Sequence, residues 1–226
     1  VYAVFSLLQR LGQPLCKLLP GRLGRRSRKL LGRLTGPSLV RLERRGLDDV
    51  ASPELPEDCQ VTSLAQAPLG DYLHVMRESL VPEADNDWFQ REVASLPFYL
   101  PDDVLLIYCA GSPAAGAAAL RTVYRQHPAG LIHMVGVAHP YRGRGFGRTI
   151  TLLALAHFRQ ADLDVVTLTT MPHRTPAISM YLSCGFRPVC NTLVEKALWA
   201  RIQHKVERVK RPSPGSRGGH RPVSAE

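Results

Sequence analysis

The stretch from residue 137 to residue 148 holds the densest set of residues that can do chemistry, and it indicates the binding of a diphosphate. Glycines stand at alternate positions, Gly143, Gly145 and Gly147, so several backbone N–H groups can point into one concavity. A helix is expected to begin at once, and its N-terminus adds partial positive charge. The full charges in this stretch come from Arg142, Arg144 and Arg148.

Two common nucleotide-binding patterns do not fit this loop. The Walker pattern needs a lysine after its last glycine, whereas Gly147 is followed by Arg148 and Thr149. The dinucleotide fingerprint spaces its glycines as G-x-G-x-x-G and needs an acid after the next strand, where this chain has threonines. For this stretch alone, two alternatives stay open: a glycine-rich turn with incidental arginines, and a short RNA-binding arginine–glycine segment.

A second motif lies downstream, where Ala177, Tyr181, Gly185 and Phe186 form the pattern A-x-x-x-Y-x-x-x-G-F. A tyrosine in an amphipathic helix is by itself usually a core residue. The two motifs together, in this order, resemble the GNAT superfamily of N-acetyltransferases. The resemblance covers roughly residues 60–193 and is strongest over residues 131–188.

The resemblance implies direct transfer of an acetyl group from acetyl-CoA, as co-substrate, to a primary amine in a ternary complex, with no metal. It implies a strand over residues 131–137 that splays from its neighbour and offers backbone N–H groups to an oxyanion. It implies that Tyr181 protonates the leaving thiolate as general acid. The residues expected to bind acetyl-CoA are Val135, Val137, Arg142, Gly143, Arg144, Gly145, Phe146, Gly147, Arg148 and Arg174, the last standing where many members have an asparagine.

The general base is the least defined part of the expected site. Many members carry a glutamate on the strand at residues 131–137, and this chain has none there. His133 lies in that strand and can accept a proton near neutral pH, so it is the candidate base. A water chain without a dedicated base is an equal alternative. Other nearby groups are expected to be structural, solvent-facing or part of the acceptor wall: His139, His173, Asp85 and Asp87.

Hydrophobic periodicity predicts the elements that must position these residues. The predicted order is β-α-α-β-β-β-α-β-α, a mixed α/β domain of the α+β kind, with a central mixed sheet flanked by helices, as in the GNAT-like acyl-CoA N-acyltransferase fold. Another helix is predicted over residues 194–209, where the family has its last strand. The expected strands are 60–65, 104–109, 115–125, 131–137 and 165–170, and the expected helices are 71–80, 87–95, 148–159 and 176–183.

Charge and the resemblance together imply three parts of the chain: a basic extension and linker (1–57), the N-acetyltransferase domain (58–200) and a basic, disordered tail (201–226). Residues 1–47 carry a net charge of +10, whereas residues 48–200 carry −5. The basic arms are therefore expected mainly to be solvated, and their removal, including residues 1–50, to leave acetyl-CoA binding intact. The five scattered cysteines suit a reducing cytoplasm rather than a disulfide framework.

A second class of function stays open beside the enzyme. The chain is alternatively a non-catalytic acyl-CoA-binding module whose basic arms contact a nucleic acid or a membrane, although such contact is not the main expectation. A third class uses a longer acyl donor or a hydroxyl acceptor. The expected partner is a small-molecule or peptide amine, and a homodimer is left open.

Overall fold

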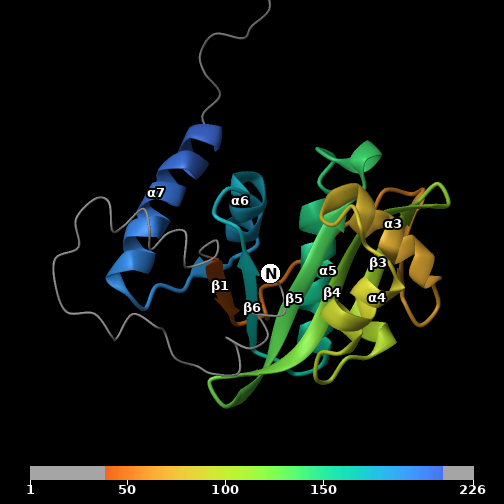
Figure 1. The fold of residues 1–226 in the computed structure, drawn as a ribbon, viewed down its shortest axis with the longest axis horizontal. Coiled ribbons are helices and arrows are strands. Elements are labelled where there is room, and N and C mark those ends of the chain that lie inside the picture. The colour runs from red at the N-terminus through yellow and green to blue at the C-terminus, as the bar shows by residue number, and fades with distance from the viewer. Residues whose placement is uncertain (1–38, 211–226) are drawn as a thin grey trace, which may run out of the picture.

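The computed structural model describes residues 39–210, which build one seven-stranded mixed sheet with helices on both faces (Figure 1). The strand order across the sheet is β2-β3-β4-β5-β6-β1-β7. The expected mixed sheet flanked by helices is confirmed. The strands are β1 (Val40–Arg45), β2 (Cys59–Ser63), β3 (Val104–Cys109), β4 (Ser112–Tyr124), β5 (His127–Val137), β6 (Val165–Thr170) and β7 (Arg187–Pro188). The helices are α3 (Leu69–Ser79), α4 (Asn86–Phe89), α5 (Phe146–Gln160), α6 (Thr175–Ser183) and α7 (Leu193–Lys210), with a π-helical turn at Gln90–Ala94 and 3-10 turns at Pro101–Asp103 and His139–Tyr141.

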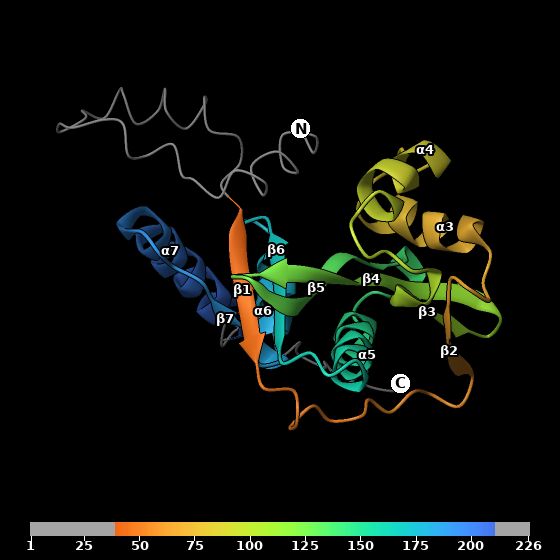
Figure 2. The same ribbon diagram turned by 90° about the horizontal axis from the view of Figure 1, so that it is seen from below.

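The centre of the sheet is apolar on both faces, and each face has its own helices (Figure 2). Helices α3 and α4 pack on one face, through a cluster that includes Tyr72, Met76 and Trp88. Helix α5 packs on the other face, through a cluster that includes Leu155 and Phe158. Strand β4 is rich in alanine and glycine, so both layers of helices can approach it closely.

Strand β1 lies inside the sheet, between β6 and β7, although its residues belong to the expected basic extension. It pairs antiparallel with the whole of β6, from Val40 opposite Thr170 to Arg45 opposite Val165. Its residues alternate in burial, with Val40 and Leu42 facing the core and Arg41 exposed. The expectation of an extension over residues 1–57 is therefore wrong for residues 40–45.

Helix α7 crosses residue 200, so the expected end of the domain at that residue is also wrong. It runs without a break from Leu193 to Lys210, and Ile202 and Val206 are buried against Val40 and Ile178. Within residues 39–210, no helix combines the length and apolar character needed to cross a membrane. The remaining expectations for the basic arms fall on residues 1–38 and 211–226, which lie outside the described residues.

Two of the five cysteines form a disulfide, contrary to the expectation that all would stay unpaired. Cys59 on β2 and Cys109 on β3 are direct cross-strand partners in an antiparallel pair, and their Cα atoms are 4.1 Å apart. Cys184 and Cys190 are free thiols. The spacing of cysteines along the chain carried no sign of this bond, because the register of β2 against β3 creates it.

Reducing this disulfide is expected to lower the free energy of unfolding by about 2–4 kcal/mol, since the bond closes a loop of about 50 residues. Urea denaturation with and without a reductant measures the change. A variant with both Cys59→Ala and Cys109→Ala is the control, and its stability should not respond to the reductant. Peptide mapping that finds both thiols free in the purified protein would contradict the assignment.

Candidate active site

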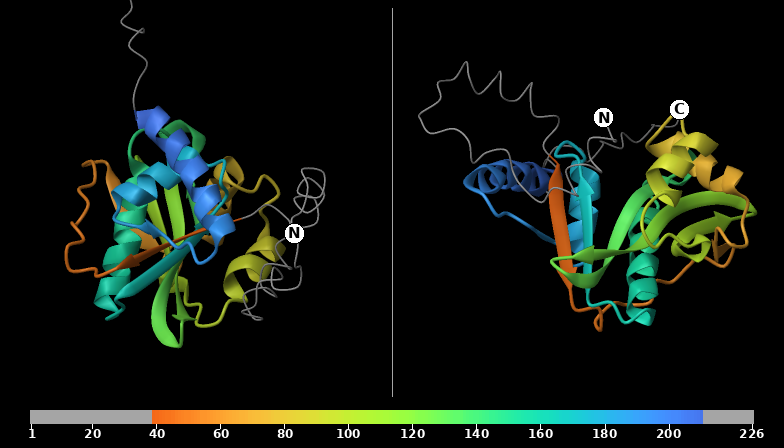
Figure 3. Two further views of the ribbon diagram at one scale, coloured as in Figure 1. Left: turned by 90° about the vertical axis from the view of Figure 1, so that its left-hand side faces the viewer. Right: turned by 60° about the horizontal axis from the view of Figure 1, so that its bottom comes forward.

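Strands β5 and β6 meet at one end and diverge toward the other, which opens a gap in the sheet (Figure 3). They pair in parallel only at Gly130 opposite Val166 and Leu131 opposite Thr167. From Ile132 onward, β5 has no strand partner on this side within the described residues. Its backbone groups there are available to a ligand, because an unpaired strand edge presents free N–H and C=O groups. The structure therefore contains the expected splayed strand.

A bulge in β5 lies directly beside this gap. Gly136 pairs with Gly116 and His133 with Ala118, so Met134 and Val135 together stand opposite the single residue Ala117. Met134 has a positive φ of 49°, which is uncommon for a residue with a side chain. Bulges re-aim backbone and side-chain groups beside active sites. Sequence analysis missed this feature, and no glycine or proline at residues 134–135 signals it.

The direction of the Val137 N–H can be derived from its neighbour. The N–H of Ala138 donates to the carbonyl of Ala114 on β4 at 2.9 Å. Successive residues of a strand point their N–H groups to opposite edges, so Val137 points its own toward the gap. The Val137 carbonyl is also reached there by a side chain, because Arg142 Nε donates to it at 3.3 Å. Val135 lies at the bulge itself, next to the same gap.

The glycine loop follows β5 and presents a row of unpartnered backbone donors. Gly143 and Gly145 have positive φ values of 75° and 88°, which glycine adopts at little cost, and Gly145 is the N-cap of α5. The backbone N–H groups of residues 143–147 have no acceptor among residues 39–210, whereas that of Arg148 donates back to the Gly145 carbonyl at 2.9 Å. Free N–H groups at a helix N-terminus form an anion-binding site. The buried side chain of Phe146 anchors this helix start in the core.

The arginines around the loop have different surroundings. Arg142 donates to the carbonyls of Val137 and Glu78, so its guanidinium ties the end of β5 to helix α3. Arg144 lies over the Tyr141 and Phe146 rings, at 5.5 Å from each centroid. Arg148 is exposed in the first turn of α5, and Arg174 is half-buried at the start of α6. The structure thus leaves Arg148 and Arg144 exposed beside the loop, and gives Arg142 protein partners.

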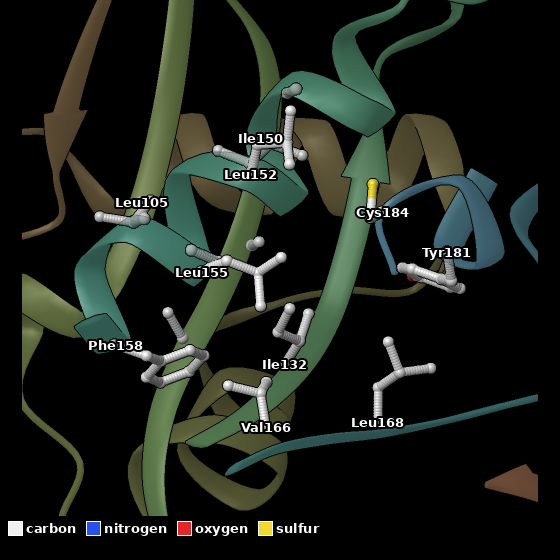
Figure 4. Close-up of a cluster of buried hydrophobic side chains, with 14 of the residues drawn as sticks. Leu105, Ile132, Ile150, Leu152, Leu155, Phe158, Val166, Leu168, Tyr181 and Cys184 are labelled. Carbon is white, nitrogen blue, oxygen red and sulfur yellow. The ribbon is translucent and has the colours of Figure 1, made fainter. Parts of the chain in front are cut away.

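Tyr181 lies on α6, and its ring is buried in the core cluster beside Cys184 (Figure 4). The ring packs edge to face on Phe186, with the centroids 6.0 Å apart. Burial raises the pKa of its phenol above the usual range, and the nearby Arg174 opposes this effect. The hydroxyl has no hydrogen-bond partner among the described residues, and unlike those of Tyr72 and Tyr124 it is not sealed from solvent. Tyr181 therefore holds its proton at neutral pH and has no acceptor for it within residues 39–210.

His133 projects toward the α3–α4 side of the sheet, where its Nε2 donates to the Glu92 carbonyl at 3.0 Å. Glu92 belongs to the π-helical turn, a feature frequently found at functional sites. Burial lowers the pKa of His133 to about 4, and the bond to the Glu92 carbonyl opposes this shift. The imidazole is therefore neutral near pH 7, with Nδ1 as its free acceptor.

Lowering the pH from about 6.5 to 4 is expected to destabilise the protein partly through His133. The pKa of His133 is about 4 in the folded state, which is lower than in the unfolded state. The unfolded state therefore takes up the proton first as the pH is lowered, and the free energy of unfolding decreases across this window. Denaturant titrations across the window should show a shallower decline for His133→Gln. His139→Gln is the control, because His139 is exposed. Equal pH slopes in wild type and His133→Gln would contradict the burial argument.

The other expected residues are a helix cap or are exposed. Asp85 caps helix α4 by accepting from the Trp88 N–H at 2.7 Å. Asp85 and Asp87 also line a shallow hollow of about 410 Å³, with Leu73 as its apolar wall. His139 and His173 are exposed. No group of three or more His, Cys, Asp or Glu side chains within the described part of the chain is placed to hold a metal ion.

Comparisons with known proteins agree with this geometry. The profile of the acetyltransferase (GNAT) family matches residues 73–186, just over half of the chain. A mycothiol acetyltransferase of Nocardia farcinica is 40% identical over 63 residues, which cover 28% of this chain and 21% of that protein. One of Corynebacterium glutamicum is 29% identical over 161 residues, which cover 66% of this chain and 53% of that protein.

A solved structure has the same fold. A GCN5-related N-acetyltransferase from Sphaerobacter thermophilus superposes with a TM-score of 0.50 at 20% sequence identity, over 74% of this chain and 55% of that one. This chain thus spans about half, or less, of the length of the relatives described.

Proposed function

Because the chain belongs to the acetyltransferase (GNAT) family, whose enzymes use acetyl-CoA as co-substrate, we propose that it transfers the acetyl group of acetyl-CoA to a primary amine by direct attack in a ternary complex. The observation that carries this proposal is the continuity of the gap beside β5 with the glycine loop. The gap offers the Val137 N–H, and the loop offers the unpartnered N–H groups of residues 143–147. Together they match a ligand with a diphosphate and a polar extended arm.

The residues of the chain divide the work between binding and proton transfer. The loop amides, with Arg144 and Arg148, hold the pyrophosphate, and Arg174 adds positive charge at the start of α6. The Val137 N–H, with the N–H of Val135 at the bulge, stabilises negative charge on the acetyl oxygen. Tyr181 donates its proton to the departing sulfur, because its raised pKa keeps the hydroxyl protonated until charge builds there.

For the acceptor amine, two routes of deprotonation fit the surroundings of β5. The free Nδ1 of His133 accepts a proton, but with a pKa of about 4 it is a weak base at neutral pH. A water chain leading out along the gap is the other route. A loss of more than tenfold in turnover for His133→Gln would select the histidine.

A small-molecule amine is the acceptor class we propose, with a peptide amine as the second choice. Its support is that the relatives in Nocardia farcinica and Corynebacterium glutamicum are mycothiol acetyltransferases. An acceptor panel read out by release of free coenzyme A thiol tests this proposal, with the acceptor of the mycothiol acetyltransferases, amino sugars, polyamines and peptides as its arms. No thiol release with any amine, but a thermal shift with acetyl-CoA, would favour the non-catalytic acyl-CoA-binding module.

Replacing Gly145 with Asp is expected to weaken acetyl-CoA binding by tenfold or more. The open space at Gly145 admits a side chain, so the new carboxylate would lie among the loop amides and repel the pyrophosphate. Gly145→Asn is the matched control, because asparagine has the same size and tolerates a positive φ. Calorimetry should give a much larger loss for Asp than for Asn. Equal affinities for the two variants would rule out this loop as the pyrophosphate site.

A further inference from the structure

Arg44 is a buried arginine on β1 whose guanidinium ends at helix α6. Its side chain is 7% exposed, and Nη1 donates to the Cys184 carbonyl, the last of that helix turn. Its other donors bind residues close to it in the chain. Nε donates to the Gly46 carbonyl at 3.3 Å, and Nη2 donates to Asp49 Oδ1 at 2.5 Å. The guanidinium thus connects the N-terminal strand to the C-terminus of α6.

The backbone around Cys184 leads directly to Tyr181. The Tyr181 carbonyl accepts from the N–H groups of Cys184 at 3.0 Å and Phe186 at 3.1 Å. The last turn of α6 is therefore one hydrogen-bonded unit, and it contains both Tyr181 and the carbonyl that Arg44 binds. A cation at the C-terminus of a helix is favourable, since the free carbonyls there carry partial negative charge.

Gly185 makes this contact possible. Its φ of +84° turns the chain out of the helix, and a Cβ atom at this position would lie 2.5 Å from Arg44 Nη1. A glycine here leaves the guanidinium its place against the helix end. The Cys184 carbonyl, directly before this glycine, thus has its partner 140 residues earlier in the chain.

We propose that Arg44 is a positioning residue for the acetyl transfer: by holding the last turn of α6, it fixes the position of the Tyr181 hydroxyl. This inference rests on the proposed role of Tyr181 as proton donor. In this role Arg44 does not touch the substrate, so its effect on the rate comes from the orientation of the Tyr181 hydroxyl. Displacements of about 1 Å in a catalytic group can cost on the order of 10²-fold in rate.

The test is a double-mutant cycle between Arg44→Lys and Tyr181→Phe. Lysine keeps the charge but cannot satisfy three acceptors with a planar fork. In the wild-type background, Arg44→Lys is expected to lower kcat about tenfold, with the KM for acetyl-CoA within about twofold. In the Tyr181→Phe background, it should lower the remaining kcat by less than about twofold, because the hydroxyl to be positioned is gone. Asp49→Asn is the control, since Asp49 is exposed and the contact with Cys184 stays.

Each result separates the two hypotheses. Equal fold losses in both backgrounds, or a kcat for Arg44→Lys like that of wild type, would overturn the positioning role. Wild-type turnover of Tyr181→Phe alone would overturn the proton-donor role on which the inference rests. Melting temperatures of all variants show whether Arg44→Lys remains folded at the assay temperature. Should it unfold there, the assays are run at a lower temperature where the four proteins of the cycle are folded.

Discussion

Tyr181→Phe should lower turnover by about 10²–10⁴-fold, the usual contribution of a general acid. Phenylalanine keeps the ring packed on Phe186 and removes only the hydroxyl, which has no protein partner among the described residues. The affinity for acetyl-CoA should change little, because the proton matters mainly as charge builds on sulfur. Steady-state kinetics with the acceptor found by the panel, together with calorimetry for acetyl-CoA, measures both quantities.

The control for this variant is Tyr141→Phe. Tyr141 also lies beside the loop, but its hydroxyl already donates to the Cys109 carbonyl at 3.3 Å. The Tyr141→Phe variant should keep turnover near that of wild type. A Tyr181→Phe enzyme that turns over like its parent would show that Tyr181 is only a core residue.

Leu42→Asp is the second large effect, and it is expected to destabilise the protein by on the order of 4 kcal/mol or more. Leu42 is fully buried at 0% exposure in the middle of β1, where a carboxylate would have neither water nor a partner. Deleting residues 1–50 should be equally damaging, because it removes β1 from between β6 and β7. Urea denaturation and the yield of soluble protein measure the loss.

Arg41→Asp is the matched control, because Arg41 neighbours Leu42 on the same strand but is exposed. Its stability should stay within about 0.5 kcal/mol of wild type, as for most surface substitutions. Deleting residues 1–38 leaves the whole sheet in place and should keep folded protein. Folded, active protein after deletion of residues 1–50 would contradict the place of β1 in the sheet.

Sequence periodicity predicted the elements whose signals are local. The strand at Val104–Cys109 and the helix ahead of Gly185 were predicted within a residue or two of their observed bounds, because each is a continuous apolar or periodic run. Strand β1 was not predicted, because only Val40 and Leu42 are apolar on its inner face and the third inward residue is Arg44. An arginine at an inward position in an arginine-rich stretch has the pattern of a solvated arm until its partner on α6 is known.

The candidate site also contains parts that the sequence predicts and parts that it does not. The glycine loop and Tyr181 could be found from the chain because their motifs depend on residue type and spacing. The bulge at Met134 could not, since it arises from the count of residues on β4 against those on β5. Nor could the partner of His133, because the Glu92 carbonyl belongs to a segment 41 residues earlier and any residue type supplies a carbonyl.

The place of β1 also determines when the sheet can be completed during synthesis. Arg45 pairs with Val165, so β1 leaves the ribosome 120 residues ahead of the first residue of its partner strand. At about 5–20 residues per second, it waits on the order of 6–25 seconds as a strand without a sheet. Its three arginines, Arg41, Arg44 and Arg45, keep this waiting segment charged, which opposes pairing with other nascent chains. The gap beside β5 has β6 as its other side only after residues 165–170 have been synthesised, so the proposed acetyl-CoA site is incomplete in shorter nascent chains.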